Sequence, residues 1–362
     1  MLKLSAGKRK ILFLLPNLNS GGAEKVAMNY LRSLDARKFQ ATLLVFNKTD
    51  QLLELVPEEV DVIDMKTKKT SHSAWGVLMY LWRVKPDFVY TTHSRVASLL
   101  MAIRPFSSRF KHIARMQSTP SLELKYSEYG MFKKKLYSWG FNCADVVLAQ
   151  TEDMKKDAVE VFKIPDANIA VLHNPLDLLH IKCSLAELPS PYSQSNINIV
   201  AAGRLSKEKG YRLIIEAIPT LLKEYPNIVV HILGKDQGEK KELLELAEEL
   251  NVVKMIKFHG FVANPYPFYA FSDLFVLSSY WEGYPNVLLE NFYLNTPIVA
   301  TRCIPSLQEL IDVGVNGYLC EVGNAVDLAD KILLGITLKR DNIHNPSLPV
   351  EKLESILERW IN

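Results

Sequence analysis

Cysteine is scarce in this sequence. The 362 residues contain only Cys143, Cys183, Cys303 and Cys320, and no two of these form a Cys-x-x-Cys pair. Small domains built on disulfide bonds carry cysteine at much higher density, and structural zinc sites need closely spaced ligands. The pattern argues against a disulfide framework and a structural zinc site, and we expect a reducing compartment.

Long hydrophobic runs are missing as well. The longest uninterrupted apolar stretch, residues 74–82, contains a glycine and is far shorter than the roughly 20 residues of a membrane span. Near the N-terminus, basic residues 8–10 precede an apolar run that ends at Pro16, which is too short for the core of a signal peptide. We therefore expect a cytoplasmic protein whose first apolar run is a β-strand.

A dinucleotide fingerprint is also absent. The sequence holds no Gly-x-Gly-x-x-Gly, although Gly21 and Gly22 stand together between a strand and a helix. The missing spacing counts against a nicotinamide-dependent enzyme. Paired glycines at such a turn let backbone amides approach an anion, but a simple tight turn explains them equally well.

Length and composition indicate two soluble domains. A chain of 362 residues is too long for a typical single core and fits two domains of roughly 150 to 200 residues. A hydrophobic content of 48% and a charged content of 23% are ordinary for a globular protein.

The net charge of +3 hides a basic region. Residues 104–135 contain eight Lys or Arg against two acids, whereas the rest of the chain has 35 basic and 38 acidic residues. Interleaved aromatic residues make this region a candidate surface for an anionic membrane or a polyanionic acceptor. Alternatively it is the solvated flank of a helix whose apolar stripe faces the core, namely Phe132, Leu136, Trp139 and Cys143.

Strand-like runs alternate with amphipathic segments in both halves. The first half predicts strands over 10–15, 41–46, 60–63, 88–91 and 146–149, and helices over 23–34, 74–82 and 155–162, the second of them buried. The second half predicts strands over 198–202, 228–233 and 254–259, and helices over 211–222 and 240–250. This alternation predicts an α/β protein with a parallel, doubly wound sheet in each half.

A polar stretch with two prolines, residues 184–195, has the composition of a linker. We expect domains over 1–185 and 196–345, followed by a C-terminal helix over 346–362.

The most informative stretch is residues 273–301, which predicts strand, loop, short helix and strand. The loop places Glu282 at the carboxyl end of the first strand, and Glu290 follows about one turn into a helix whose amides begin near Asn286. In parallel sheets ligands bind at that edge, and a helix N-terminus offers N–H groups to phosphate. We expect phosphate on the backbone and hydroxyl groups on the two carboxylates; two solvated surface charges are the alternative.

The segment from Glu282 to Glu290, Glu-Gly-Tyr-Pro-Asn-Val-Leu-Leu-Glu, resembles the Glu-x7-Glu signature of retaining glycosyltransferases of family 4, the "group 1" family. Further motifs occur in the family's order, namely Gly203-Arg204-Leu205, Lys209-Gly210, Ile232-Leu233-Gly234 and Phe258-His259-Gly260-Phe261-Val262. The resemblance covers residues 196–325 well and the first half mainly at its start. It implies the GT-B fold, two facing Rossmann-like domains with an interdomain cleft.

This resemblance implies transfer of a sugar from a nucleotide-sugar donor, with retention, to a cell-surface polysaccharide, a lipid-linked oligosaccharide or a related acceptor. Arg204 and Lys209, two cations on one loop, suit the donor diphosphate. Glu282 would hold sugar hydroxyls and Glu290 the ribose diol, and the backbone at Val262 would contact the base. The amides at the start of the helix, around Val287 and Leu288, would help to hold the diphosphate, and Tyr284, Pro285 and Asn286 of the same segment would also bind the substrate.

We expect no metal, no cofactor beyond the donor and no nucleic acid. The sequence contains no Asp-x-Asp, the motif with which the other large glycosyltransferase fold holds a metal on the diphosphate. The cytoplasmic protein would be peripheral on the membrane if residues 104–135 bind it.

Candidate residues of the first half lie after its strands. The resemblance implies that the loop with Gly21 and Gly22 faces the phosphate site of the second domain, and that Asn174 belongs to the family's Asn-containing segment. His93 and Gln117 each follow a strand, and His93 is either structural or catalytic. Family members often carry a histidine near the position of Gln117, which leaves this glutamine as a hydrogen-bond partner for donor or acceptor.

Two other functions stay open. A hydrolase would use Glu282 and Glu290 as a carboxylate pair, although both lie on one loop-helix unit. A degenerate module would bind nucleotide sugar without turnover, for which Gln117 and the compact tail after Leu334 leave room.

Overall fold

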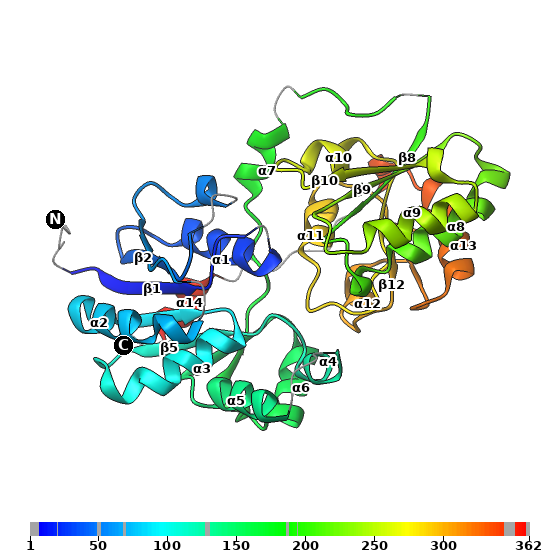
Figure 1. Ribbon diagram of the computed structural model, residues 1–362. Coiled ribbons are helices and arrows are strands. Elements are labelled where there is room, and N and C mark those ends of the chain that lie inside the picture. The colour runs from blue at the N-terminus through cyan, green and yellow to red at the C-terminus, as the bar shows by residue number, and fades with distance from the viewer. Residues whose placement is uncertain are drawn as a thin grey trace. The chain divides into compact units, whose positions relative to one another are not determined.

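The chain folds into two compact units. The computed structural model describes residues 7–19, 21–48, 52–67, 70–126, 131–185, 188–193, 195–343 and 352–359. Unit 1 comprises Met1–Pro175 and Pro349–Asn362, and unit 2 comprises Leu176–Leu348 (Figure 1).

The division comes before the polar stretch that we interpreted as the linker. Helix α7 (Leu178–Leu185) belongs to unit 2, where Ile181 is buried in a core cluster and His180 meets the ring of Tyr266 edge-on. Asn264 also donates a hydrogen bond to the carbonyl of Ser184. Proline and polar composition alone does not distinguish a linker from a surface segment held by such contacts.

Over its described residues, unit 1 holds a seven-stranded sheet in the order β3-β2-β1-β4-β5-β6-β7, paired in parallel throughout. The strands are β1 (Arg9–Leu15), β2 (Phe39–Val45), β3 (Asp61–Asp64), β4 (Phe88–Thr91), β5 (Lys111–Arg115), β6 (Val146–Ala149) and β7 (Ile169–Val171). Its helices are α1 (Gly22–Ser33), α2 (Ala74–Val84), α3 (Ser94–Ile103), α4 (Pro120–Tyr126), α5 (Met131–Asn142), α6 (Glu152–Phe162) and α14 (Leu353–Glu358).

Strand β1 shows why both faces of this sheet are covered. Ile11, Phe13 and Leu15 enter one core cluster with residues of α1 and α14, whereas Leu12 and Leu14 enter another with residues of α2 and α3. A strand buried on both faces reads as a continuous apolar run instead of an alternating one. The doubly wound α/β arrangement that we predicted is confirmed.

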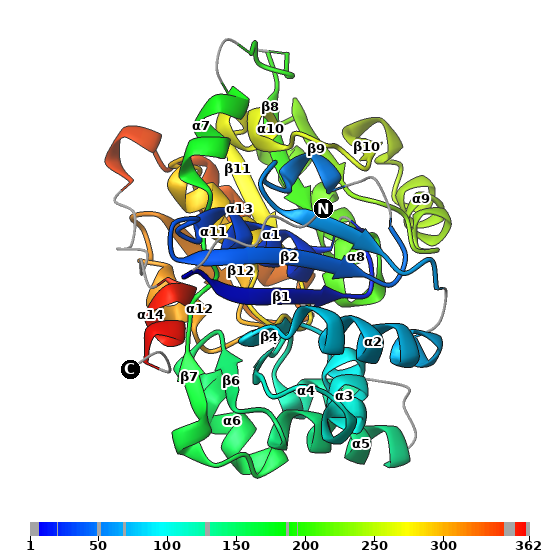
Figure 2. The same cartoon turned by 90° about the vertical axis from the view of Figure 1, so that its left-hand side faces the viewer.

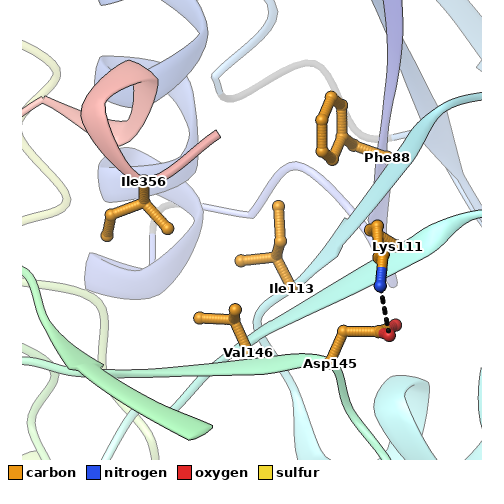
Figure 3. Close-up of a pocket in the computed structure, with 6 residues that line it drawn as sticks. All are labelled: Phe88, Lys111, Ile113, Asp145, Val146 and Ile356. Atoms are coloured by element: carbon orange, nitrogen blue, oxygen red, sulfur yellow. Dashed lines mark hydrogen bonds and ion pairs between the residues drawn. The ribbon is translucent and has the colours of Figure 1, made fainter. Parts of the chain in front are cut away.

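The C-terminal segment returns to unit 1. Leu353, Ile356 and Leu357 of α14 are buried in its core, and Figure 3 shows Ile356 beside Ile113 and Val146 in a shallow apolar niche. At the rim of the niche, Lys111 Nζ lies 3.4 Å from Asp145 Oδ1. The predicted C-terminal helix is therefore present over Leu353–Glu358, and the rest of 346–362 lies outside the described residues apart from Lys352 and Arg359.

Unit 2 holds a six-stranded sheet over its described residues, in the order β10-β9-β8-β11-β12-β13. The strands are β8 (Ile197–Ala202), β9 (Ile228–Leu233), β10 (Ile256–Gly260), β11 (Leu274–Leu277), β12 (Ile298–Thr301) and β13 (Gly317–Cys320). Besides α7 the helices are α8 (Tyr211–Glu224), α9 (Lys240–Glu249), α10 (Tyr266–Phe271), α11 (Asn286–Tyr293), α12 (Leu307–Leu310) and α13 (Ala325–Ile336).

Each sheet has one point where the strand order reverses. In unit 1 this point lies between β1 and β4, and in unit 2 between β8 and β11. The loops that leave the carboxyl ends of these neighbouring strands run to opposite sides, which leaves room for a ligand between them. Most candidate residues of both halves follow these four strands or their neighbours, whereas Asn174 follows β7 and Val262 follows β10.

Helix α2 differs from its prediction. We expected a buried helix, but only Val77, Leu78 and Leu81 are buried, whereas Trp75 and Trp82 are exposed. Within the described part of the chain, no helix combines the length and the apolar content that a membrane crossing requires.

Candidate functional site

Two loops of unit 2 meet at the reversal point of its sheet. Residues 203–210 follow β8 and residues 278–285 follow β11. Ser278 Oγ donates to the carbonyl of Lys209 over 2.8 Å, and Tyr280 N donates to the carbonyl of Glu208 over 2.8 Å. Gly210 has φ +61°, and a Cβ there would lie 2.2 Å from the Ser278 carbonyl oxygen. Only glycine permits this close approach.

The contact between these loops brings two candidate catalytic residues together. Lys209 Nζ lies 2.6 Å from Glu282 Oε1, and Ser279 Oγ donates to the same oxygen over 2.6 Å. Both side chains are largely buried, with exposed fractions of 17% for Lys209 and 11% for Glu282. Among the described residues Glu282 Oε2 has no hydrogen-bond partner, so one carboxylate oxygen can accept a hydroxyl group.

Arg204 lies on the same loop but extends into solvent. Its side chain is 56% exposed, and its ion pair is a long contact of 3.4 Å to Glu208. Such an exposed i,i+4 pair contributes little stability. The guanidinium can therefore leave Glu208 for a phosphate at small cost, whereas the ammonium of Lys209 is already fixed.

Helix α11 begins at Asn286, as predicted, and places Glu290 in its second turn. Glu290 is 3% exposed, which leaves little of it accessible to a ribose diol. Tyr284 and Leu288 are buried in the unit 2 core, and the amide of Leu288 donates to the carbonyl of Pro285. The side chains of Tyr284 and Leu288 thus belong to the core, whereas Asn286 and Val287 are only partly buried. Contacts of this loop and helix start with the diphosphate stay a prediction.

Val262 lies beyond the end of β10, next to the loops of β8 and β9. The amide of Gly234 donates to the carbonyl of Gly260 over 2.7 Å, and a Cβ on Gly234 would lie 1.7 Å from the Gly203 carbonyl oxygen. These contacts pack the three loops tightly. The backbone at Val262 stays a predicted base contact.

Buried polar groups support the site. Tyr211 Oη donates to the carbonyl of Gly203 over 2.8 Å, and burial raises the pKa of this hydroxyl, which keeps it protonated. Burial, and next the charge of Glu282, raises the pKa of Cys303 to about 12, so its thiol stays neutral beside the site. Over the described ranges, no three His, Cys, Asp or Glu side chains are grouped as metal ligands.

In unit 1 a carboxylate and an imidazole meet at the reversal point. Glu24 of α1 and His93, which follows β4, approach to 3.3 Å between Oε1 and Nε2. A Cβ on Gly21 would lie 2.2 Å from Glu24 Oε2, and the Gly21 amide donates to Asn19 O. Gly21 therefore accommodates the carboxylate of its own helix, and a role of Gly21 and Gly22 in binding phosphate stays a prediction.

Asn174 is part of a buried network beneath the same edge. Arg115 is 2% exposed and donates to Asn174 Oδ1 over 2.5 Å, while Asn174 Nδ2 donates to Gln150 Oε1 over 3.1 Å. The side-chain amide nitrogen of Gln117, Nε2, is buried and has no hydrogen-bond partner in the described part of the chain. Among the described candidates of this unit, Gln117 has an unused donor and His93 a buried Nδ1 that also lacks a partner, whereas Asn174 is held in place by its neighbours.

The basic region over residues 104–135 is not one continuous surface. Arg115 is buried, Arg104 and Lys111 pair with Asp145, and Lys134 donates to the carbonyl of Leu124. Side chains 131–133, which include Phe132 and Lys133, lie outside the described ones. The alternative, a helix whose apolar stripe faces the core, is also wrong, because Leu136, Trp139 and Cys143 are exposed.

Sequence reasoning missed several supporting residues, namely Ser278, Ser279, Tyr211, Glu208, Arg115 and Gln150. The serines had a signal, because two polar residues directly follow the buried strand β11. Arg115 had none, because its neighbours in sequence give no sign that Asn174 would meet it in the core.

Comparison with known proteins agrees with this geometry. The profile described as "Glycosyl transferases group 1" matches residues 191–344, and the profile "Glycosyltransferase Family 4" matches residues 20–179.

Individual relatives extend the comparison over most of the chain. An undecaprenol-linked glycan 4-alpha-N-acetylgalactosaminyltransferase of Campylobacter jejuni is 27% identical over 332 residues, 87% of each protein. The lipopolysaccharide 1,6-galactosyltransferase of Escherichia coli is 22% identical and covers 87% of this chain and 86% of its own. Anabaena Alr3699/HepE, solved with UDP and glucose, has a TM-score of 0.74 at 21% identity, with 92% of this chain and 93% of that chain covered. The chain belongs to the family 4, group 1 glycosyltransferases and has their GT-B fold.

Proposed function

We propose that this glycosyltransferase moves a sugar, with retention of the anomeric configuration, from a uridine diphosphate sugar to a lipid-linked or polysaccharide glycan. The observation that carries the proposal is the pairing of Lys209 with Glu282 at the reversal point of the unit 2 sheet. The Anabaena structure, with UDP and glucose bound, supports the choice of nucleotide.

Lys209 lies between the proposed sites of the diphosphate and of the sugar. Its ammonium has three N–H donors, one of which faces Glu282 Oε1 at 2.6 Å. The others are available to the diphosphate, and Arg204 adds a planar fork from the same loop. These two cations stabilise the charge that develops on the leaving group, and the proposal assigns no part of that charge to a metal.

Glu282 orients the sugar. Its Oε1 is fixed by Lys209 and Ser279, so Oε2 faces the site in one orientation. A carboxylate held in this way accepts charge-assisted hydrogen bonds from sugar hydroxyls. Glu290 is the proposed partner of the ribose diol.

In the proposed step the bond between the sugar C1 and the diphosphate oxygen breaks. The acceptor hydroxyl oxygen forms the new bond to C1 on the same face, and its proton passes to the leaving diphosphate. The transition state is oxocarbenium-like. No protein nucleophile is required, because the leaving group itself takes the proton.

The acceptor would bind at the carboxyl edge of the unit 1 sheet. Gln117 offers a buried donor there, and the imidazole of His93 contacts Glu24. The named Campylobacter relative acts on a diphospho-undecaprenol glycan. A lipid-linked acceptor of this kind would bring the present chain to a membrane surface.

A thermal-shift screen against a panel of nucleotide sugars tests the donor. A bound ligand raises the unfolding temperature by mass action, so the matching UDP-sugar should raise it for the wild type but much less for the Arg204→Ala variant. Equal shifts with all nucleotide sugars, or none with any UDP-sugar, would contradict the proposal.

A further inference from the structure

Helix α2 exposes an apolar face. Trp75, Met79 and Trp82 follow one another at helical spacing, and their exposed fractions are 69%, 44% and 47%. The opposite side of the helix, with Val77, is buried in the unit 1 core. A single exposed apolar residue is common on protein surfaces, but two tryptophans and a methionine in one row are not.

Phe106 extends this face. It is 67% exposed, and its carbonyl accepts a hydrogen bond of 2.6 Å from Trp82 Nε1. Ser108 Oγ donates to the carbonyl of Leu81 over 3.0 Å, which holds the same loop against the end of α2. We call Trp75, Met79, Trp82 and Phe106 the tryptophan face.

Positive charge lies beside the tryptophan face. From Met65 to Pro86 the sequence has five Lys or Arg and no acid. The three that the structure describes, Lys66, Arg83 and Lys85, are all exposed. The acids that flank this segment are occupied, because Asp64 accepts from the amide of Lys66 and Asp87 pairs with Arg9. Arg109 is exposed in the loop that follows Phe106.

We propose that the tryptophan face binds the interfacial region of an anionic lipid bilayer. Tryptophan rings lie at the level of lipid headgroups, and an apolar helix face flanked by Lys and Arg is typical of helices that lie in the membrane plane. The clustered cations favour an anionic leaflet. A protein partner or a second copy would not require a flanking segment that carries cations and no acid.

The position of α2 places the tryptophan face beside the carboxyl edge of the unit 1 sheet, where the acceptor is proposed to bind. The helix runs from the carboxyl end of β3 towards the amino end of β4, so Trp75 lies at the carboxyl edge of the sheet and Trp82 about 10 Å further along the axis. His93 and Gln117 follow strands at that same edge. This step rests on the proposed function: a bilayer that contacts α2 would present a lipid-linked glycan to the carboxyl edge of the sheet.

Helix α5 is a secondary contact. It packs against α3, which also packs against α2, and the three lie on one side of unit 1 in both views (Figures 1 and 2). Leu136 and Trp139 of α5 are exposed at 37% and 41%. The row on α2 is more exposed, so α2 carries the main interaction.

Flotation of the full-length protein with vesicles tests the assignment. We expect the wild type to bind phosphatidylglycerol-containing vesicles at low salt, to bind phosphatidylcholine vesicles more weakly, and to keep part of its binding at high salt because only the charged component is screened. The W75S/M79S variant should lose more than about tenfold in apparent affinity. Trp82 stays intact in that variant, so the hydrogen bond to Phe106 is preserved.

Two controls make the result specific. L178S/L179S removes a comparable exposed pair from α7 of unit 2 and should bind vesicles like the wild type, as should K134S/K135S to within a few fold. Donor hydrolysis should be equal in all variants, which separates this proposal from the donor chemistry. The proposal fails if the wild type ignores anionic vesicles, if W75S/M79S binds as the wild type does, or if that variant instead converts a dimer to a monomer in light scattering.

Discussion

Lys209 Nζ and Glu282 Oε1 lie 2.6 Å apart, although 73 residues separate them in sequence. The pair joins the loop after β8 to the loop after β11, and its donor and acceptor capacity is only partly used. Because both side chains are mostly buried, removing either partner leaves the other charge poorly compensated.

A double-mutant cycle measures this coupling. Lys209→Met and Glu282→Gln should each destabilise the protein, and the double variant should be less destabilised than their sum by about 1 kcal/mol or more. Urea unfolding of the four proteins provides the free energies. Strict additivity would mean that the ion pair is absent in solution.

The proposed phosphate contacts of Arg204 and Lys209 predict a loss of catalysis without a loss of fold. Arg204→Ala and Lys209→Ala should each raise the transition-state free energy by about 2–4 kcal/mol, as measured by kcat/KM. Arg212→Ala is the matched control, because Arg212 lies in the first turn of α8 just beyond this loop and forms an exposed pair with Glu216. Unchanged kcat/KM in both test variants would falsify the assignment of the cations.

Glycine at position 210 should be indispensable for the contact between the loops. Gly210→Ala introduces a Cβ 2.2 Å from the Ser278 carbonyl oxygen at φ +61°, and should destabilise the protein by about 2 kcal/mol or more. Gly238 also has a positive φ, but there is open space around a Cβ built on it. The Gly238→Ala variant therefore measures the cost of the backbone strain alone. The account is wrong on this point if both variants unfold at the same urea concentration.

Lowering the pH should destabilise unit 2, because it protonates a pair of neighbouring histidines. His231 Nδ1 lies 3.0 Å from His259 Nε2, and His231 Nε2 lies 3.2 Å from Asn198 Oδ1. Burial lowers the pKa of His231 from 6.5 to about 4, and burial followed by the charge of Lys257 lowers that of His259.

Because the folded pKa is below the unfolded one, the stabilisation is complete above pH 6.5 and is lost as the pH falls towards about 4. The slope should reach at most about 1.4 kcal/mol per pH unit for each histidine. His231→Gln should flatten this slope in urea unfolding between pH 7 and 4, whereas His72→Gln, at an exposed position, should not. A wild-type stability that is constant over this range would contradict the prediction.

Chelation of divalent metals should leave the rate of sugar transfer nearly unchanged. In the proposed mechanism Arg204 and Lys209 meet the charge of the leaving diphosphate, so excess EDTA should change the initial rate by less than about twofold. Loss of activity that Mg²⁺ or Mn²⁺ restores would show that a metal shares this task.

Much of the fold could be predicted from local patterns. The apolar runs Phe88–Thr91 and Val146–Ala149 are strands with the predicted bounds, because each is bounded by polar residues or turn formers and is buried on both faces. The alternation with helices then leaves few topologies. Helix α2 was placed correctly, but its buried face was not: tryptophan and methionine suggest a core, and only the neighbours of a helix decide which face is covered.

The site was predictable where residues are close in sequence. Glu282, Asn286 and Glu290 form one loop-helix unit, and its shape follows from the glycine and proline that precede the helix. The contacts of Glu282 with Lys209 and of Arg115 with Asn174 join distant segments, and no local pattern encodes such a distance. The linker was misplaced for the same reason, since α7 is held by residues that lie far along the chain.

The most direct test of the central claim is the release of UDP from a UDP-sugar donor by the wild type, by Glu282→Ala and by the control Glu216→Ala. Because Glu282 is proposed to orient the sugar and Glu216 lies on the exposed side of α8, we expect the wild type and Glu216→Ala to release UDP at similar rates. Glu282→Ala should be slower by about a hundredfold while its unfolding remains cooperative. Equal rates in all three, or no release by the wild type with any UDP-sugar, would contradict the account.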